Sequence, residues 1–188
     1  KAGKSVYVEK PMSLNYKAAQ KMYLAAEEHQ VKLVVAHYRR EWPLFKKIKE
    51  LVDAGTIGDI RLVKLVYDKP ALTAAELADE KIAWRVNPAI SGGGLFHDLA
   101  PHQLDILYHL FGDTKRIQGI ATNQAGNYEA HDLVAGNILF NSNTAFTGTW
   151  YFNAASPGDY CEISGSKGSI RFSFFSNSFI ELTVNGNT

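Results

Sequence analysis

Hydrophobic and small residues near the start of the chain follow a strand period and then a helix period. A β-branched and aromatic run over 5–8 predicts a strand. Apolar residues then recur at helical spacing over 16–29, where Asn15 or Ser13 is the expected cap, and a buried-type strand follows at 32–36. Strand, helix and strand in so few residues predict a βαβ unit with parallel strands and a right-handed crossover.

The next stretch of the chain mixes helical and strand patterns. Pro43 suits the first turn of a helix, and Gly55 is a plausible end for it. Three glycines at 92–94 precede an apolar run with helical character. The expected elements are a helix over 43–52, a strand over 60–67, a short helix within 71–79, a loop over 83–88 and a long helix over 95–111.

Beyond residue 112 the pattern changes to short strands separated by Gly, Asn, Ser and Pro turns. The expected strands are 116–122, 133–140, 145–152, 160–164, 169–174 and 179–184. This spacing predicts a meandering antiparallel sheet. The sheet is rich in aromatic residues, namely Phe140, Phe146, Trp150, Tyr151, Phe152, Phe172, Phe174, Phe175 and Phe179.

These aromatic residues bear on how the sheet is covered. One face is expected to pack on helices, and the other then exposes aromatic rings unless it meets a partner. We therefore expect a homo-oligomer formed through this sheet. The alternative is that the rings alternate cleanly and one row is half-buried. The fold class expected for the whole chain is an α/β piece at 1–36 followed by an α+β domain at 37–188, with an open, mostly antiparallel sheet and helices on one face.

Composition restricts the classes of function. The 188 residues are 46% hydrophobic and 21% charged, as in ordinary globular proteins, and the net charge of +1 gives no bulk attraction to nucleic acid or to an anionic membrane. The single Cys161 forms no intrachain disulfide, and no apolar run is long enough for a bilayer, so a cytoplasmic location is expected. Because the chain opens at Lys1 without an initiator Met, we expect it to be a piece of a longer protein.

Candidate chemistry is concentrated in the glycine-led helix. Asp98 and His102 are four residues apart, so on a helix they project from the same face. A carboxylate near an imidazole sets its tautomer and prepares it for proton transfer. The glycines at 92–94 let the backbone approach another group closely. Together they predict the floor of an active site; the alternative is a glycine-rich turn with a surface Asp and a helix-capping His.

Two features qualify this helix. Pro101 breaks a hydrogen bond inside a helix, and it is tolerated if the helix begins near Asp98, whose side chain would then be partly used as a cap. Asp98, His102 and Asp105 lie one turn apart, which makes a metal-dependent hydrolase or isomerase conceivable, but ligand pairs such as His-x-x-x-His are absent from the sequence. We therefore favour acid–base use and expect no metal. The sequence also lacks a Gly-x-Ser-x-Gly elbow and any phosphate-binding glycine fingerprint.

Glu9-Lys10-Pro11 follows the first strand, at the carboxyl end of the predicted parallel pair. Ligands of open α/β sheets bind at that end. A lysine there donates to a substrate hydroxyl or carbonyl. The alternative is a surface Glu–Lys pair before a proline turn.

Taken in order, these motifs resemble the Gfo/Idh/MocA family of NAD(P)-dependent oxidoreductases. The resemblance rests on a first motif from Lys1 to Pro11 that ends in Glu9-Lys10-Pro11, on Tyr38-Arg39-Arg40 with Pro43 and Gly55-Thr56-Ile57-Gly58, on Trp84-Arg85 with Gly92-Gly93-Gly94, Asp98, His102 and Asp105, and on Gly165-Ser166-Lys167-Gly168. It spans nearly the whole chain. It implies that 1–36 is the last βαβ portion of a Rossmann domain and that 37–188 is a substrate-binding and oligomerisation domain.

The resemblance also implies roles for individual residues. Lys10 would orient the oxygen of a sugar or polyol substrate, His102 would take its proton as hydride leaves, and Asp98 would assist or bind a substrate hydroxyl. Glu9, Lys10, Trp84 and Arg85 would border the cofactor, NAD or NADP. Because the dinucleotide fingerprint is absent, this chain alone should bind cofactor poorly, and the activity would belong to the longer protein. The competing hypothesis is a non-catalytic dimerisation or ligand-binding domain.

Overall fold

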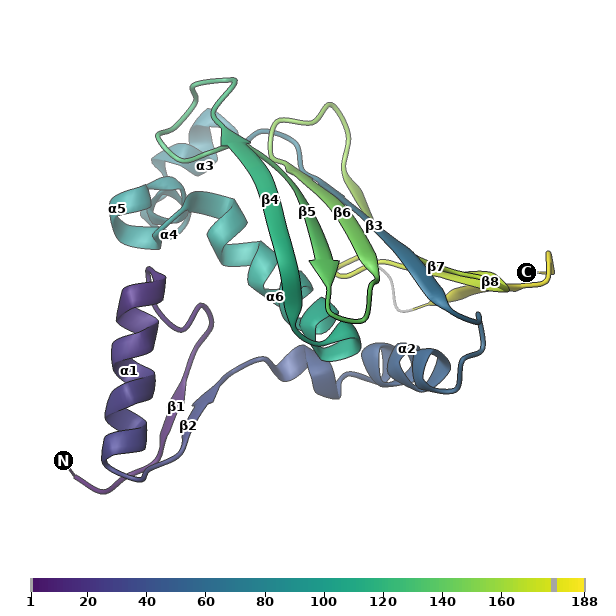
Figure 1. Cartoon of the computed structure of the whole chain (residues 1–188). Helices are drawn as coiled ribbons and strands as arrows, with labels where there is room; N and C mark the ends of the chain where they lie inside the picture. The colour runs from purple at the N-terminus through teal and green to yellow at the C-terminus, as the bar shows by residue number, and fades with distance from the viewer. Residues whose placement is uncertain (1, 177–178, 188) are drawn as a thin grey trace.

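A computed structural model describes residues 2–176 and 179–187, so Lys1 of the first motif lies outside the described residues. The chain forms two sheets, one of two strands and one of seven. We call residues 2–36 the N-terminal unit and the described residues from 38 onward the sheet unit. Figure 1 shows the N-terminal unit beside the sheet unit, joined to it by the segment that follows β2.

The N-terminal unit is the predicted βαβ element. It consists of β1 (Val6–Val8), α1 (Tyr16–Glu28) and β2 (Leu33–Val35), and β1 pairs with β2 in parallel. Asn15 caps α1, because its side-chain oxygen accepts a hydrogen bond from the backbone N–H of Ala18 at 3.0 Å. The prediction of strand, capped helix and parallel strand is confirmed.

The sheet unit contains helices before and between its strands. Its helices are α2 (Pro43–Asp53), α3 (Ala74–Ala78), α4 (Glu80–Ala83), α5 (Pro88–Ser91) and α6 (Gly94–Phe111), and its 3-10 turns are η1 (Tyr38–Glu41) and η2 (Trp84–Val86). The prediction of a loop over 83–88 is therefore wrong, because most of these residues lie in η2 or α5. The helices on either side of η2 are capped by side chains, since Asp79 accepts from the Lys81 amide at the start of α4 and Asn87 from the Ala89 amide at the start of α5.

The large sheet is mixed rather than a continuous meander. Its strands are β3 (Ile60–Asp68), β4 (Thr114–Thr122), β5 (Leu133–Phe140), β6 (Ala145–Tyr151), β7 (Gly158–Gly165), β8 (Gly168–Phe172) and β9 (Glu181–Val184). Their order is β4-β5-β6-β3-β7-β8-β9, with β3 parallel to β6 and the other pairs antiparallel. The early strand β3 thus separates two antiparallel groups that follow it in sequence. The expectation of a mostly antiparallel sheet is confirmed.

Alternation along the strands directs the aromatic rings to one face. Rings at Phe140, Phe146, Trp150 and Phe172 are buried in a core shared with α2 and α6. Period-two alternation places these rings on the helix side, whereas Tyr151 of β6 points to the opposite face and is half-buried, as the alternative of clean alternation predicted. Phe179 is an exception at 57% exposed.

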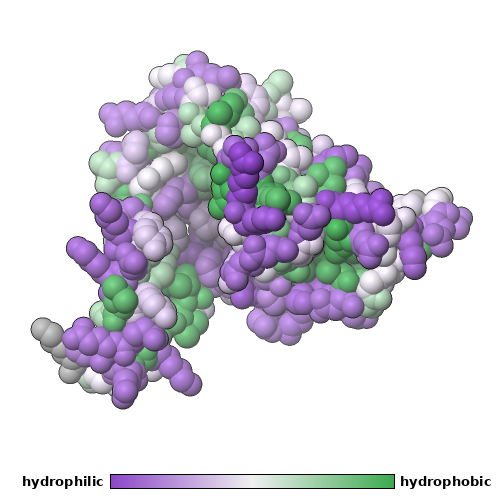
Figure 2. Space-filling model, viewed as in Figure 1, coloured by the Kyte–Doolittle hydropathy of each residue, from purple (hydrophilic) through white to green (hydrophobic). Residues whose placement is uncertain are grey.

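The opposite face of the sheet is open and more polar. Lys64 and Glu162 lie opposite each other there, on β3 and β7, with Nζ and Oε1 3.7 Å apart. Figure 2 shows hydrophilic and hydrophobic residues intermixed over the side of the molecule in view. Within the part of the chain that the structure describes, no helix combines the length and hydropathy needed to cross a membrane.

Candidate active site

The glycine turn before α6 brings the two units together. Gly92 adopts φ +85, and a Cβ there would lie 3.0 Å from the backbone oxygen of Leu14 in the N-terminal unit. His97 Nε2 lies 3.4 Å from the backbone oxygen of Ser13. The close approach expected from the glycines is confirmed, and the group approached is the segment that leads into α1.

Helix α6 confirms the long helix predicted over 95–111 and begins one residue earlier. It starts at Gly94, whose N–H donates to Ser91 Oγ at 3.0 Å, and it continues through Pro101. The condition considered for Pro101, a start near Asp98, is therefore not met, and Asp98 is not a cap. Leu95 and Ala100 are buried on this turn, and their packing offsets the hydrogen bond that Pro101 cannot make. The Asp98 carboxylate is consequently free to bind a side chain from elsewhere.

Lys10 and Asp98 form the central contact of the site. Lys10 follows β1, and its Nζ donates at 2.8 Å to Asp98 Oδ1 and at 2.8 Å to the Asp98 backbone oxygen. The two side chains are 14% and 24% exposed, so the contact is largely shielded from water. Arg85 Nε lies 3.4 Å from the other carboxylate oxygen. Lys10 and Arg85, from separate parts of the chain, therefore both contact the carboxylate of Asp98, and all three are predicted site residues.

His102 lies one turn after Asp98 on the same helix and is 6% exposed. The rings of Tyr38 and Phe175 stand edge-on to it, with centroids 5.7 and 6.0 Å away. Burial, aided by the charges of Lys10 and Arg39, lowers the pKa of His102 to about 4. The imidazole is then neutral at pH 7, which is the form that accepts a proton.

The carboxylate–imidazole hydrogen bond predicted from the spacing is not formed. Asp98 directs the hydrogen bonds described for its side chain to Lys10, not to His102. A shared helical face brings two side chains near each other, but the stronger attraction of the ammonium orients the carboxylate. Asp98 therefore influences His102 through its negative charge and by fixing the position of the Lys10 ammonium.

The remaining predicted cofactor residues lie at the edge of this cluster or outside it. Trp84 is 40% exposed, its indole N–H donates to the Lys81 carbonyl at 3.0 Å, and the Arg85 guanidinium lies 4.8 Å from its ring. Trp84 thus joins the cluster through Arg85. Glu9 is exposed, and none of the ion pairs found among the described residues includes it.

Asp105, considered as a metal ligand from the sequence, has a different partner. Its carboxylate accepts two hydrogen bonds from the Arg40 guanidinium, one of them at 2.8 Å, and lies 3.6 Å from His37 Nδ1. This paired contact fastens η1 to α6. Across residues 2–176 and 179–187, no group of three or more His, Cys, Asp or Glu side chains is arranged to hold a metal ion.

Sequence reasoning missed Phe175, whose ring contacts His102, Arg39, whose charge acts on it, and Tyr67, which packs against Phe175. Tyr67 is buried at an inward position of β3, and burial together with Asp159 raises its pKa to about 12, so it keeps its proton. Arg39 lies with its Cζ 4.3 Å from the Trp42 ring and 4.6 Å from the Phe175 ring. Tyr67 could have been found from the sequence, because it occupies an inward-facing position in the alternating pattern of β3. Arg39 belongs to the motif Tyr38-Arg39-Arg40, from which no role was predicted for it. Phe175 follows a strand, and no local sequence pattern marks it as a site residue.

Two protein-family models match the chain. The model described as the GFO/IDH/MocA C-terminal domain matches residues 45–171. The model described as an oxidoreductase family with an NAD-binding Rossmann fold matches residues 1–37. Lys10 therefore lies in the region matched by the second model, and Asp98 and His102 lie in the region matched by the first.

Individual relatives agree with these matches. Oxidoreductase P35 of Formosa agariphila is 42% identical over 98% of this chain and 56% of its own length. The scyllo-inositol 2-dehydrogenase (NADP(+)) IolW of Bacillus subtilis is 33% identical over 70% of this chain and 35% of its own length. The chain spans about half the length of the curated relatives it matches.

A solved structure shares the fold. Levoglucosan dehydrogenase, in complex with NADH and L-sorbose, superposes with a TM-score of 0.84 at 22% identity, covering 100% of this chain and 52% of that one. At this identity the likeness concerns the fold alone.

Proposed function

Because the chain belongs to the GFO/IDH/MocA family of oxidoreductases, we propose that the enzyme containing it transfers a hydride between a nicotinamide cofactor and a sugar, polyol or related hydroxyl compound. The observation that supports this most strongly is the meeting of Lys10 with Asp98 beside the neutral, buried His102. Relatives named as an NADP(+)-dependent inositol dehydrogenase and xylose dehydrogenase act on compounds of this class.

In this proposal His102 moves the proton. Oxidation of an alcohol removes a hydride from carbon and a proton from oxygen, and the bound cofactor supplies the hydride acceptor. A neutral imidazole is able to take the hydroxyl proton, and its low exposure keeps competing water away. In the reverse direction the same nitrogen returns the proton to the oxygen.

Lys10 is the residue proposed to hold the substrate oxygen. An ammonium has three N–H donors, and here two of them are directed at Asp98, through its side chain and its backbone oxygen. The third donor remains to point at the hydroxyl or carbonyl oxygen of the substrate. Asp98 thereby fixes the direction of Lys10, and Arg85 helps to balance the charge of the carboxylate.

The residues present fit the nicotinamide end of a dinucleotide but not its phosphates. Lys10 lies just beyond the carboxyl end of β1, the end of a parallel sheet at which such ligands bind. Trp84 and Arg85 are the proposed border of the cofactor. Since the sequence has no phosphate-binding glycine fingerprint, we propose that the chain by itself binds NAD or NADP weakly and that activity belongs to the complete enzyme.

We also propose that the enzyme is a homo-oligomer through the open face of the large sheet. That face lies opposite the helices, and it presents half-buried Val66 and Tyr160 beside the Lys64–Glu162 pair. Light scattering tests this: a dimer or larger assembly is expected, and Val66→Arg should shift it toward monomer. A monomer at all protein concentrations would contradict it.

The test of the main proposal uses the complete enzyme and a panel of sugars and polyols with NAD and with NADP. A substrate of this class should be oxidised, and His102→Gln should reduce kcat about 10²–10⁴-fold, the usual value of a positioned acid or base. His109→Gln is the matched control, because His109 lies two turns further along α6 and should leave turnover nearly unchanged. Equal effects of the two substitutions would contradict the assignment of the proton to His102.

A further inference from the structure

The segment that follows β8 places an aromatic ring against His102. Phe175 lies in this segment, with its ring centroid 6.0 Å from that of His102 and 5.0 Å from that of Tyr67. The Arg39 guanidinium lies 4.6 Å from the same ring. Among the described residues, the strand pairings of β8 end at Phe172, so Phe174 to Ser176 are held by contacts other than the ladder.

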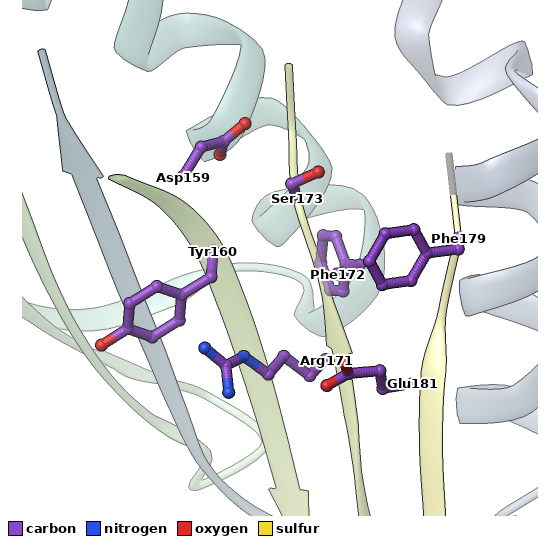
Figure 3. Close-up of a pocket in the computed structure, with 7 residues that line it drawn as sticks. All are labelled: Asp159, Tyr160, Arg171, Phe172, Ser173, Phe179 and Glu181. Carbon is purple, nitrogen blue, oxygen red and sulfur yellow. The ribbon is translucent and has the colours of Figure 1, made fainter. Parts of the chain in front are cut away.

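Asp159 supplies that fixation from the start of β7. Its Oδ1 accepts a hydrogen bond from the Phe174 amide at 3.0 Å, and its Oδ2 accepts from the amides of Phe175 at 2.6 Å and Ser176 at 3.0 Å. Oδ2 also accepts from Ser176 Oγ at 3.1 Å. Figure 3 shows the Asp159 carboxylate beside the end of the strand at Ser173, at the border of a cavity of about 220 Å³.

The same segment is also held from the N-terminal side of the sheet unit. Arg39 Nη1 donates to the Phe174 backbone oxygen at 2.8 Å. The Phe174 peptide groups are therefore bound by a carboxylate through the N–H and by a guanidinium through the carbonyl. Charge-assisted hydrogen bonds of this kind are stronger than neutral ones, so the backbone before Phe175 has little freedom.

We propose that Asp159 is a positioning residue for the reaction: by binding the amides of Phe174, Phe175 and Ser176 it fixes the Phe175 ring against His102 and keeps water from the imidazole. The proposal rests on the proposed function, in which His102 moves the proton. Asp159 touches neither His102 nor the reacting oxygen. It acts through the ring that it places.

Two effects of removing the Asp159 charge have opposite signs, which makes the proposal testable. Loss of a negative charge alone would lower the pKa of His102 further, because the imidazolium would be less favoured. Release of the Phe175 ring would instead admit water, favour the charged form and raise the pKa. The groups that face or influence His102 are Lys10, Asp98, Arg39, His37, Tyr38 and the Phe175 ring, against which Tyr67 packs. A substitution at Asp159 replaces none of them, and its charge also acts on Arg39 and Tyr67.

The experiment is a titration of the His102 imidazole by ¹⁵N NMR, with its signal assigned by its disappearance in His102→Gln. In Asp159→Asn the pKa of His102 should rise from about 4 toward the ordinary value of about 6.5, and Phe175→Leu should produce the same rise. Ser176→Ala, which removes the hydroxyl bond but keeps all three amide bonds, should leave the titration unchanged. An unchanged or lowered pKa in Asp159→Asn overturns the proposal.

A second measurement needs no substitution and remains decisive if Asp159→Asn does not fold. The amides of Phe175 and Ser176 should exchange with deuterium slowly in the unmodified protein, because the Asp159 carboxylate binds them. Exchange at the rate of an open loop would overturn the proposal. Both measurements are independent of turnover, so the function proposed for His102 can fail in kinetic assays while Asp159 is still shown to position Phe175.

Discussion

The two units of the molecule differ sharply in how much core they have. In the N-terminal unit the buried hydrophobic residues are the small Ala26 and Ala36, while Tyr7 is 67% and Tyr16 76% exposed. The sheet unit buries large side chains such as Phe45 at 1% exposed. A region with little core of its own is held in place by what it touches. The proposed site lies where these two unlike regions meet.

The contacts between the units explain this placement. Lys10 reaches Asp98, and the backbone at Leu14 approaches Gly92. The sheet unit supplies the rigid partner at both points, since α6 is anchored in the main core. Within this chain, Lys10 is thus positioned by contacts with a unit that has a large core of its own.

The largest effect expected is on the free energy of unfolding of the sheet unit. Phe45→Ala should cost about 3–5 kcal/mol, because it opens a cavity in a core that Phe172 and Phe174 share. Tyr23→Ala, at a residue 55% exposed on α1, should change it by no more than about 0.5 kcal/mol. Urea unfolding of both variants checks this, and equal losses would remove the contrast between the two units.

A slightly smaller effect is expected from pH. Because the pKa of His102 is about 4 in the folded protein and about 6.5 when unfolded, its neutral form is favoured by folding. Its contribution is fully present above about pH 6.5 and is lost as pH falls toward 4, to an extent of about 2–3 kcal/mol. Urea midpoints between pH 7 and 4 should fall, and His102→Gln should make this fall shallower. A variant with an unaltered pH slope would show that the imidazole is not buried in its neutral form.

The contact between η1 and α6, inside the sheet unit, provides a third test. Arg40→Met removes the paired hydrogen bonds from Asp105, whose side chain is 8% exposed, and should destabilise the sheet unit by about 1–3 kcal/mol. Arg40→Lys keeps the positive charge but not the paired guanidinium donors, and it should lose less stability. The measurement is thermal unfolding of the three proteins. A Met variant as stable as the parent would indicate that the Arg40–Asp105 contact is not what fixes η1 to α6.

The local spacing of hydrophobic residues predicted much of the fold but not the pairing of strands that are far apart in sequence. The βαβ element and the strands after residue 112 follow from alternation and helical spacing, which depend on neighbouring residues alone. The position of β3 between β6 and β7 depends on burial of Val63 and Leu65 within a sheet completed much later in the chain. No local pattern encodes that choice.

The site shows the same division. Lys10, Asp98 and His102 were identifiable from motif and spacing, and the structure brings the first two into contact. The edge-on ring of Phe175 depends on three amides binding a carboxylate from another strand, which leaves no trace in local sequence. Likewise, Pro101 suggested a later helix start, whereas tertiary packing of α6 outweighed that local preference.

The central claim is that Lys10 from the N-terminal unit and His102 from the sheet unit act together on the same substrate oxygen. A double-mutant cycle on kcat/KM in the complete enzyme, with Lys10→Met, His102→Gln and both together, measures this directly. Residues that act as a unit give a double variant within about tenfold of the poorer single one, and this is the result we predict. A double variant whose loss equals the product of the two separate losses would contradict the account.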